Sequence, residues 1–434
     1  MRPGELLRLY LSRLRMFSRN IRLLLLGDLL IGLGMTFWGL LFNLYLKQFG
    51  ADMGLDDAGT GMFIGKTTAI AQVAAAVCAL PAGFFASRWD HRRVLIVSHL
   101  VSLAAFVGAI ISHTVSGMHF FLFLGAGTSV FFWVVTGPFT MENTSSEERP
   151  YVFTLAFTLR LVGSIAGNIL AGHVKDWSAL AGLSELTAYR TAIIAGLAVS
   201  LLGVIPFLLI RPRKHDACVQ EEGLTLSGIR DWDWPYFVRA LLPGTVLSIG
   251  AGLIVQFMNL YLKDSFPGLS DAKIGFYMSL TSATMVFGML AAPLLAEKKG
   301  KVRTIVGTQL ASLPFMLALA VTTDLRIAVA AMLIRASLMN MSGPISNTLV
   351  MELCRKREQG VLSALFTLNW NLSWAGSALV FGHLQGNYKL MFFVAIGLYI
   401  VSTTLYGMLF RGAEAELDRR KKAALGGLEV FEPR

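Results

Sequence analysis

Residues 21–46 read IRLLLLGDLLIGLGMTFWGLLFNLYL, and this stretch decides the class of fold. Nearly all of its side chains are apolar, and a helix needs about 20 such residues to cross the hydrocarbon core of a membrane. The apolar residues follow one another without alternating, which excludes the strands of a membrane β-barrel. The stretch therefore predicts a membrane-spanning helix.

The composition extends this prediction to the whole chain. Of its 434 residues 55% are hydrophobic and only 15% are charged, and the mean hydropathy is +0.61. A soluble domain carries about 25% charged residues, so most of this chain must have lipid as its solvent. The net charge of +11 does not indicate nucleic acid, because Lys and Arg lie in the gaps between apolar runs.

Eleven further apolar runs follow the first one. They lie at residues 59–86, 93–112, 118–140, 151–173, 189–210, 236–262, 271–296, 303–322, 325–347, 360–384 and 388–410. We therefore predict an all-α membrane protein with twelve transmembrane helices. The short gap at residues 322–325 is the weakest separator between two of them.

The basic residues predict the orientation of the chain. With both termini in the cytoplasm, the cytosolic gaps hold roughly four times as many Lys and Arg as the opposite side, as the positive-inside rule requires. The basic residues assigned to the opposite side are Lys47, Lys175, Arg190, Lys263, Lys273, Arg326 and Lys389. We expect a multi-pass protein of the cell membrane.

The chain also repeats itself. The sequence NLYLK occurs at residues 43–47 and again at 259–263, and GLDDA at 54–58 returns as GLSDA at 268–272. Gly-Pro and Met-Glu pairs and an FTL triplet recur at nearly the same offset, so helices 1–6 correspond in order to helices 7–12. Such repeated halves enclose a site that is open to either side in turn.

This repeat predicts the domain organisation. Two six-helix bundles occupy residues 21–210 and 236–410, and a polar cytosolic linker at 211–235 joins them. Residues 1–20 suit a basic amphipathic segment on an anionic membrane surface, or equally a mobile basic tail. Residues 411–434 form a cytosolic tail.

At this point the chain resembles the major facilitator superfamily over nearly its whole length. The superfamily's loop between helices 2 and 3 follows the pattern G-x-x-x-D-R-x-G-R-R/K, and residues 83–93 here read GFFASRWDHRR. The resemblance implies a cytosolic gate at Arg88, Asp90 and Arg92, although Ser87 replaces the acidic residue. The second copy keeps an acid, which implies that Glu297 with Lys298 performs that role; the alternative is that both loops only hold positive charge.

Helix 5 is similar to proton-coupled antiporters of the superfamily. Its glycines Gly163, Gly167 and Gly172 follow their glycine-rich pattern, although Asn168 stands where those proteins have proline. Small residues at this spacing also let helices pack closely in lipid, so packing is the simpler explanation.

Four ionisable side chains lie inside the predicted spans. They are Asp28, Lys66, Arg160 and Arg335, and each costs about 2.5–3.5 kcal/mol on insertion scales. The resemblance implies that all four lie on helices that border the transport cavity. The cations would bind an anionic group and Asp28 would exchange a proton, or Asp28 pairs with Arg160 or Lys66 and only locks helices together.

Uncharged polar residues complete the predicted site. Gln256, Asn259, Asn369 and Trp370 suit an amphipathic solute, although interhelical hydrogen bonds and packing explain them as well.

These residues predict a secondary active transporter that works by alternating access, is coupled to protons, and exports a small amphipathic or anionic solute. The alternatives are a facilitative uniporter and a membrane sensor or scaffold that transports nothing. Motifs of an enzyme, a phosphate-binding loop or a metal site are absent, so we expect no enzyme activity and no cofactor. We expect a monomer whose partners are the solute, protons and the bilayer.

Overall fold

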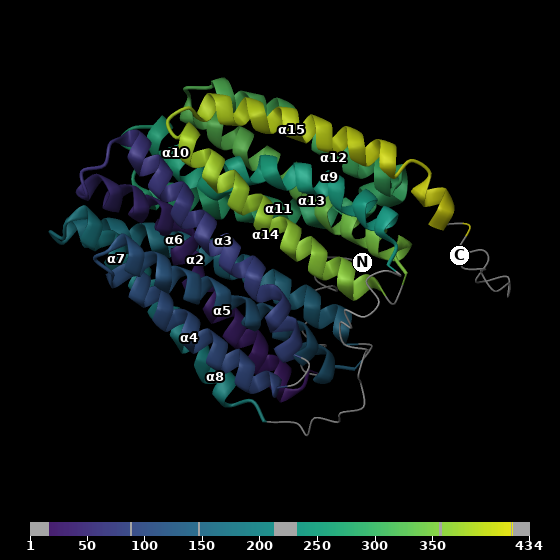
Figure 1. Ribbon diagram of the computed structural model, residues 1–434, viewed down its shortest axis with the longest axis horizontal. Helices are drawn as coiled ribbons and strands as arrows, with labels where there is room; N and C mark the ends of the chain where they lie inside the picture. Colours follow the sequence, from purple (N-terminus) through teal and green to yellow (C-terminus); the bar gives the residue numbers. More distant parts are fainter. Residues whose placement is uncertain are drawn as a thin grey trace, which may run out of the picture. The chain divides into compact units, whose positions relative to one another are not determined.

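A computed structural model describes residues 17–86, 89–145, 148–211, 232–355, 358–417 and 419 of the chain. Within these ranges the regular secondary structure is helical, without strands, which confirms the predicted fold class. Figure 1 labels the helices along the chain. Most of the predicted segments at 1–20, 211–235 and 411–434 lie outside the described residues.

Each of the first six apolar runs corresponds to a helix, with ends that agree to within a few residues. They correspond to α2 (Arg19–Asp52), α3 (Asp57–Ala86), α4 (His91–Ile111), α5 (Val115–Glu142), α6 (Arg149–Leu180) and α7 (Glu185–Leu202), which α8 (Val204–Leu208) continues.

The second six runs match helices in the same way. They correspond to α9 (Trp234–Ile254) with η2 (Val255–Phe257) and α10 (Met258–Ser265), then α11 (Asp271–Lys299), α12 (Lys301–Val321), α13 (Leu325–Leu353), α14 (Gln359–Leu384) and α15 (Tyr388–Leu409). The weak separator at 322–325 is real, because α12 ends at Val321 and α13 begins at Leu325.

Helix starts are fixed locally by capping side chains. A side-chain oxygen at the position before the helix accepts a hydrogen bond from a backbone amide of the first turn, which satisfies one of the amides that lack a partner within the helix. The residues that do this are Ser18, Asp90, Thr114, Ser184, Asp233, Asp324 and Asn387.

Eleven segments of the described chain are long and apolar enough to cross a membrane. Helix α14 is long enough but is not among them. The asparagines Asn369 and Asn371 and the tryptophans Trp370 and Trp374 occupy its middle and lower its apolarity. A polar centre is expected of a helix that faces water or another polar surface within the membrane.

The described helices divide into two compact units. Unit 1 comprises the described parts of Met1–Met53, Ile70–Gly223 and Ser270–Ser279, and unit 2 those of Gly54–Ala69, Leu224–Leu269 and Leu280–Arg434. Helices α3 and α11 are therefore each shared, with the first turns of α3 in unit 2 and those of α11 in unit 1.

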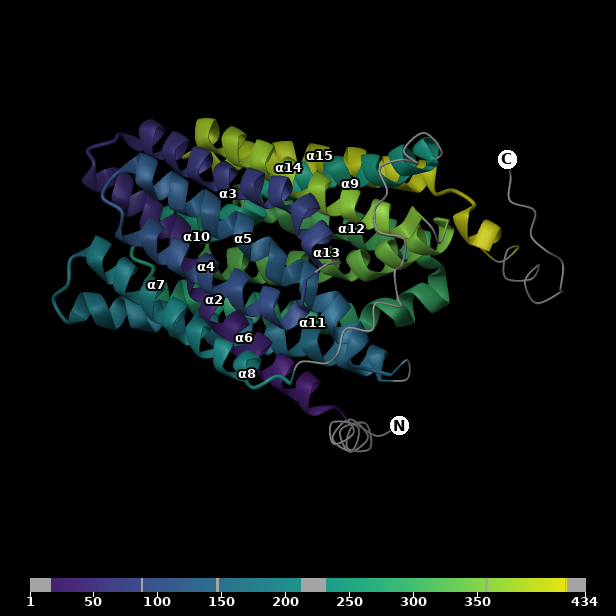
Figure 2. The same cartoon turned by 60° about the horizontal axis from the view of Figure 1, so that its bottom comes forward.

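Within unit 1, α2 packs against α6 and α7, and α4 packs against α5. Within unit 2, α9 packs against α14 and α15, and α12 packs against α13 and α15. Figures 1 and 2 both show α15 beside α9 and α12. Each unit has its own apolar core, centred on Ile21 and Phe207 in unit 1 and on Phe237 and Phe410 in unit 2.

The contact between α2 and α7 depends on glycine. A Cβ atom added at Gly34 would collide with the backbone of Gly196 and Ser200, and one at Gly196 would collide with Phe37. Small residues at a helix crossing let two backbones approach closely, which is how helices associate in lipid.

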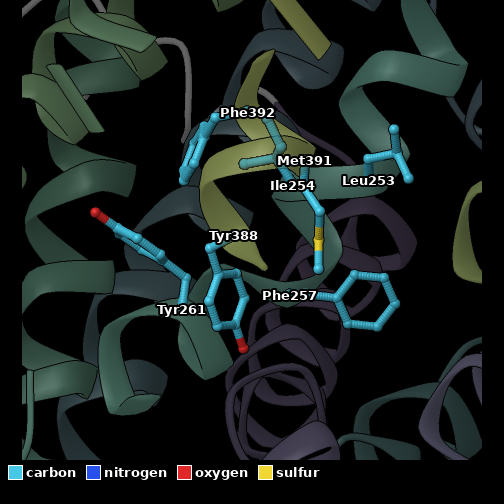
Figure 3. A pocket seen from close by; sticks show the side chains of 7 residues that line it. All are labelled: Leu253, Ile254, Phe257, Tyr261, Tyr388, Met391 and Phe392. Atoms are coloured by element: carbon cyan, nitrogen blue, oxygen red, sulfur yellow. The ribbon is translucent and has the colours of Figure 1, made fainter. Parts of the chain in front are cut away.

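Helix α9 is interrupted, whereas its repeat partner α2 is continuous. The 3-10 turn η2 separates α9 from α10, and Gln256 lies in this turn. A cavity of about 10 Å³ lies beside the interruption. Figure 3 shows the seven apolar and tyrosine side chains that line it, among them Phe257, Tyr261 and Tyr388. A cavity of this volume has room for about one water molecule, so it is a packing gap and not a solute site.

Candidate functional site

Unit 1 contains an ion pair between two of its membrane-spanning helices. The Nε atom of Arg160 on α6 donates to Oδ2 of Asp28 on α2 at 2.9 Å. The Asp28 side chain is only 3% exposed, whereas that of Arg160 is 37% exposed. The pairing that the sequence analysis considered between these residues is therefore present, and the cation is its accessible member.

An aromatic ring holds the other side of this cation. The guanidinium carbon of Arg160 lies 4.8 Å from the ring centre of Trp133 on α5, a cation–π contact. Trp133 itself packs edge-on against Phe132, which is buried in the core of unit 1. Three helices thus fix the position of one guanidinium group.

The Asp28 carboxylate uses only part of its bonding capacity. Its Oδ1 atom is buried and has no hydrogen-bond partner within the described protein. A buried carboxylate oxygen without a donor is costly, and a proton or a water molecule satisfies it. The pair can therefore exchange partners: an anion can replace Asp28 on Arg160, and a proton can replace Arg160 on Asp28.

The other two predicted cations lie in different surroundings. Lys66 is exposed on α3. Arg335 on α13 is buried within unit 2, where it interacts with the hydroxyl group of Tyr399 on α15. The four ionisable residues therefore do not form one cluster within either unit, and only Asp28 and Arg160 pair.

Unit 2 gathers amide side chains around the interruption in α9. The Gln256 side chain donates to the carbonyls of Gly252, at 3.0 Å, and of Trp374 on α14, at 3.2 Å. Asn259 is buried, and its side chain accepts from the amide of Leu260 at 3.0 Å. Both residues therefore stabilise the turn that interrupts the helix.

One residue of the polar centre of α14, Asn369, contacts α9. The Asn369 carbonyl accepts from the Thr245 hydroxyl at 2.9 Å. Trp370 packs against Trp374 with ring centres 4.9 Å apart and the ring planes tilted by 35°, and 44% of Trp370 is exposed. An exposed indole in the centre of a span provides a flat apolar surface for a solute.

The predicted gate residues of unit 1 have local roles in the structure. Arg88 lies outside the described residues. Asp90 caps α4 by accepting from the amide of Arg92, and the Arg92 guanidinium donates to the carbonyls of Phe207 and Leu208 at the end of α8.

In each unit a basic side chain in the first turn of one helix pairs with a glutamate near the end of the next helix, at corresponding positions of the repeat. In unit 1 His91 Nδ1 lies 2.8 Å from Glu142 Oε2, and in unit 2 Lys301 Nζ lies 2.7 Å from Glu352 Oε2. Glu297 and Lys298 are exposed at the end of α11. The carboxylate at the first turn of α12 is instead that of Glu414.

Sequence reasoning missed a buried charge cluster in unit 1. Lys175 Nζ lies 2.6 Å from a carboxylate oxygen of both Asp271 and Glu185, and the Tyr189 hydroxyl donates to Asp271 at 3.1 Å. Asp271 is fully buried and Lys175 is 4% exposed. The apolar runs place Lys175 and Asp271 at helix ends, but only the fold shows that these ends meet within one unit.

Within the described residues no group of three or more His, Cys, Asp and Glu side chains could hold a metal ion. The chemistry of these candidate sites is therefore that of charge pairs, amides and aromatic rings.

Repeated helical units with ionisable and amide side chains inside membrane spans define a multi-pass solute transporter. The family model of the Major Facilitator Superfamily matches residues 24–378, and the chain belongs to this superfamily. Its members are transporters and not enzymes, and membership agrees with the resemblance found in the sequence.

One similar protein is YcaD from Salmonella arizonae, described as an uncharacterized MFS-type transporter. It is 24% identical over 294 residues, which cover 66% of this chain and 68% of that protein. The match supports the family but specifies no solute.

Several solved transporters share the fold. A bacterial homologue of the lysosomal transporter Spinster superposes with a TM-score of 0.72 at 13% identity, covering 91% of this chain and 97% of its own. The D-xylose-proton symporter gives 0.70 at 14% identity, covering 89% and 96%. The nucleoside transporter NupG gives 0.68 at 13% identity, covering 90% and 99%. At such identities the likeness concerns the fold alone.

Proposed function

We propose that the chain is a secondary active transporter that moves a small amphipathic or anionic solute by alternating access, with protons as the coupling ion. The observation that carries this proposal is the pair of Asp28 and Arg160, in which a buried carboxylate with one unsatisfied oxygen meets a partly exposed guanidinium. Structural locking alone would be served better by a pair whose oxygens are all satisfied.

The chemistry of Arg160 suggests the polar group of the solute. The Nε atom of Arg160 bonds to Asp28, and Trp133 covers one face of the guanidinium, which leaves the Nη groups for another partner. A guanidinium edge suits a carboxylate or phosphate, which it binds through two parallel hydrogen bonds. The exposed ring of Trp133, on the same unit, would contact an apolar part of the same solute.

We propose export as the direction, on the glycine pattern of α6 that resembles proton-coupled antiporters. In this scheme the solute and the proton compete for Asp28, so they cross the membrane in opposite directions. An amphipathic solute with a neutral polar group satisfies this condition, because it binds the carboxylate that the proton would otherwise occupy, whereas an anionic solute does not.

A second candidate function follows from the charge balance of the pair. An anion that takes Arg160 leaves Asp28 without a counter-charge in a buried site, and a proton would then neutralise it. Anion and proton would bind together and cross in the same direction. The direction in which protons move relative to the solute therefore distinguishes the two candidates.

We propose that the transporter is a monomer of the cell membrane. The distribution of Lys and Arg favours an orientation with both termini on the cytoplasmic side.

Solute binding to detergent-purified protein tests the proposal. A panel of fatty carboxylates, phosphate monoesters, quaternary ammonium compounds and neutral amphiphiles is screened by thermal shift, since a ligand of the folded state raises the apparent Tm. Neutral amphiphiles that stabilise the wild type and bind more weakly to Asp28→Asn would support the exporter. Carboxylates or phosphates that stabilise the wild type and lose roughly 10- to 100-fold in affinity in Arg160→Ala would support joint transport of an anion and a proton.

The double variant Asp28→Asn with Arg160→Gln controls for folding, because it removes both charges and leaves neither one buried alone. If Arg160→Ala binds the same anions as tightly as the wild type, the anion site is elsewhere. If the panel gives neither shift nor flux, a membrane sensor or scaffold becomes the better explanation.

A further inference from the structure

The first turn of α12 lacks a local cap. Gly300 occupies the position before the helix and has no side chain that could accept a hydrogen bond from the first amides. Its φ is +88°, a backbone conformation that strongly favours glycine. A capping Asp or Ser at this position would be strained, so a capping oxygen has to come from elsewhere in the chain.

Glu414 supplies it from beyond the last transmembrane helix. Its Oε1 atom accepts from the amide of Val302 at 2.7 Å. A Cβ atom on Gly300 would lie 2.5 Å from Glu414 Oε2, so the glycine also makes room for the carboxylate.

Two apolar anchors hold this carboxylate in place. Residues 413–417 are helical, and Ala413 and Leu417 are buried in the core of unit 2 together with Ile305 of α12. Glu414 lies between the two anchors, so its position depends on the docking of this segment.

The repeat shows what the other unit does at the same place. Helix α4 is capped by Asp90, which accepts a hydrogen bond from the amide of Arg92 at 3.2 Å. The φ angle of Asp90 is −57°, an ordinary value for a residue with a side chain. Arg92 and Val302 are each the second residue of their helix, and each amide donates to a carboxylate. The cap is therefore local in unit 1 and remote in unit 2.

We propose that Glu414 is a detachable cap of α12 and that residues 413–417 act as a switch segment for this end of unit 2. Docking of the segment places a negative charge at the N-terminus of α12, where the helix dipole favours it. Release of the segment, by a partner or a modification of the C-terminal region, uncaps the helix and loosens its first turn. Unit 1 has no such control, because its cap cannot leave.

Hydrogen exchange of the full-length protein, followed by mass spectrometry, tests this proposal. In Glu414→Ala we expect the amides of the first turn of α12 to exchange roughly 2- to 30-fold faster, the range that loss of a cap produces. Glu414→Gln keeps an acceptor oxygen and should retain most of the protection. Glu352→Ala removes a side-chain partner of Lys301 but no amide acceptor, and should leave these amides unchanged.

A second variant tests whether the cap can detach. Leu417→Ala weakens the docking of the segment and leaves Glu414 in the sequence, and we expect it to accelerate exchange in residues 413–417 and at the start of α12 together. The proposal fails if Glu414→Ala exchanges like the wild type, or if Glu352→Ala has an equal effect. It also fails if Leu417→Ala frees the segment without affecting α12.

Discussion

At the residue scale, the proposed transport function depends on how one arginine is held. Arg160 is bonded by Asp28 through a single nitrogen and is faced by Trp133. The sequence identified both charged partners, because an ionisable group within an apolar run is conspicuous. It did not identify Trp133, because an aromatic residue in a membrane helix looks like any other apolar residue until a neighbouring helix brings a cation to it.

Replacement of Trp133 tests the cation–π contact. We expect Trp133→Leu to weaken binding of an anionic solute roughly two- to fivefold, because an exposed cation–π contact contributes about 0.5–1 kcal/mol. Trp133→Phe should retain part of the affinity. Trp177→Leu, an exposed tryptophan on the same helix as Arg160, is the control. Equal affinities of Trp133→Leu and wild type in a titration would remove Trp133 from the site.

Cys354 provides a reporter at the end of α13. Burial, assisted by the nearby carboxylates of Glu358 and Asp233, raises the pKa of the Cys354 thiol to about 11. At pH 8 only on the order of one thiol in a thousand is the reactive thiolate. In a Cys78→Ser, Cys218→Ser background we expect slow maleimide labelling, with a rate that rises about tenfold per pH unit below pH 10.

Unfolding the protein should abolish this protection of Cys354. Labelling of the folded protein at pH 8 at the rate of a free cysteine would show that the thiol is neither buried nor shifted.

At the element scale, helix ends that lie far apart in the sequence meet within one unit. Lys175 near the end of α6, Glu185 at the start of α7 and Asp271 at the start of α11 form the buried cluster of unit 1. The corresponding positions of the repeat are Gln385 and the exposed Asp57, so the repeat does not conserve this charge pairing.

Neutralising Lys175 should therefore destabilise the protein. Lys175→Gln leaves Asp271 and Glu185 without their cation, and breaking a buried pair costs about 3–5 kcal/mol. We expect a clearly lower Tm in detergent, and partial recovery when Asp271→Asn is added. Lys389→Gln changes an exposed lysine and is the control. If the two lysine variants melt alike, the cluster contributes no stability.

The crossing of α2 and α7 gives a steric test. We expect Gly34→Val to lower the Tm strongly, because its side chain would collide with the backbone of α7. Gly32→Val and Gly39→Val, on the same helix, are the controls, since a Cβ at either position meets no atom within 4 Å. A similar decrease of the Tm in all three variants would show that the lower helix propensity of valine, and not a collision between helices, causes the effect.

The existence and order of the helices were predictable, because apolar runs of about 20 residues leave little choice in a membrane. The interruption of α9 at Gln256 was not, since no proline or glycine lies in the 3-10 turn itself. The cap by Glu414 was also beyond the sequence, because the residue that it serves lies 112 positions earlier.

At the scale of the whole molecule, the chain is a member of the Major Facilitator Superfamily built from two repeated units. The units differ in how they use charge. Unit 1 contains the Asp28–Arg160 pair and the Lys175 cluster, whereas unit 2 contains the interrupted helix, amides and a pair of packed tryptophans.

The most direct test of proton-coupled transport is uphill transport in proteoliposomes with an imposed pH gradient, using the solute found by thermal shift. Wild type and Asp57→Asn, an exposed aspartate variant, should accumulate or expel the solute against its gradient. Asp28→Asn should only equilibrate it. Undiminished pH-driven uphill transport by Asp28→Asn would contradict the central claim that this carboxylate carries the proton.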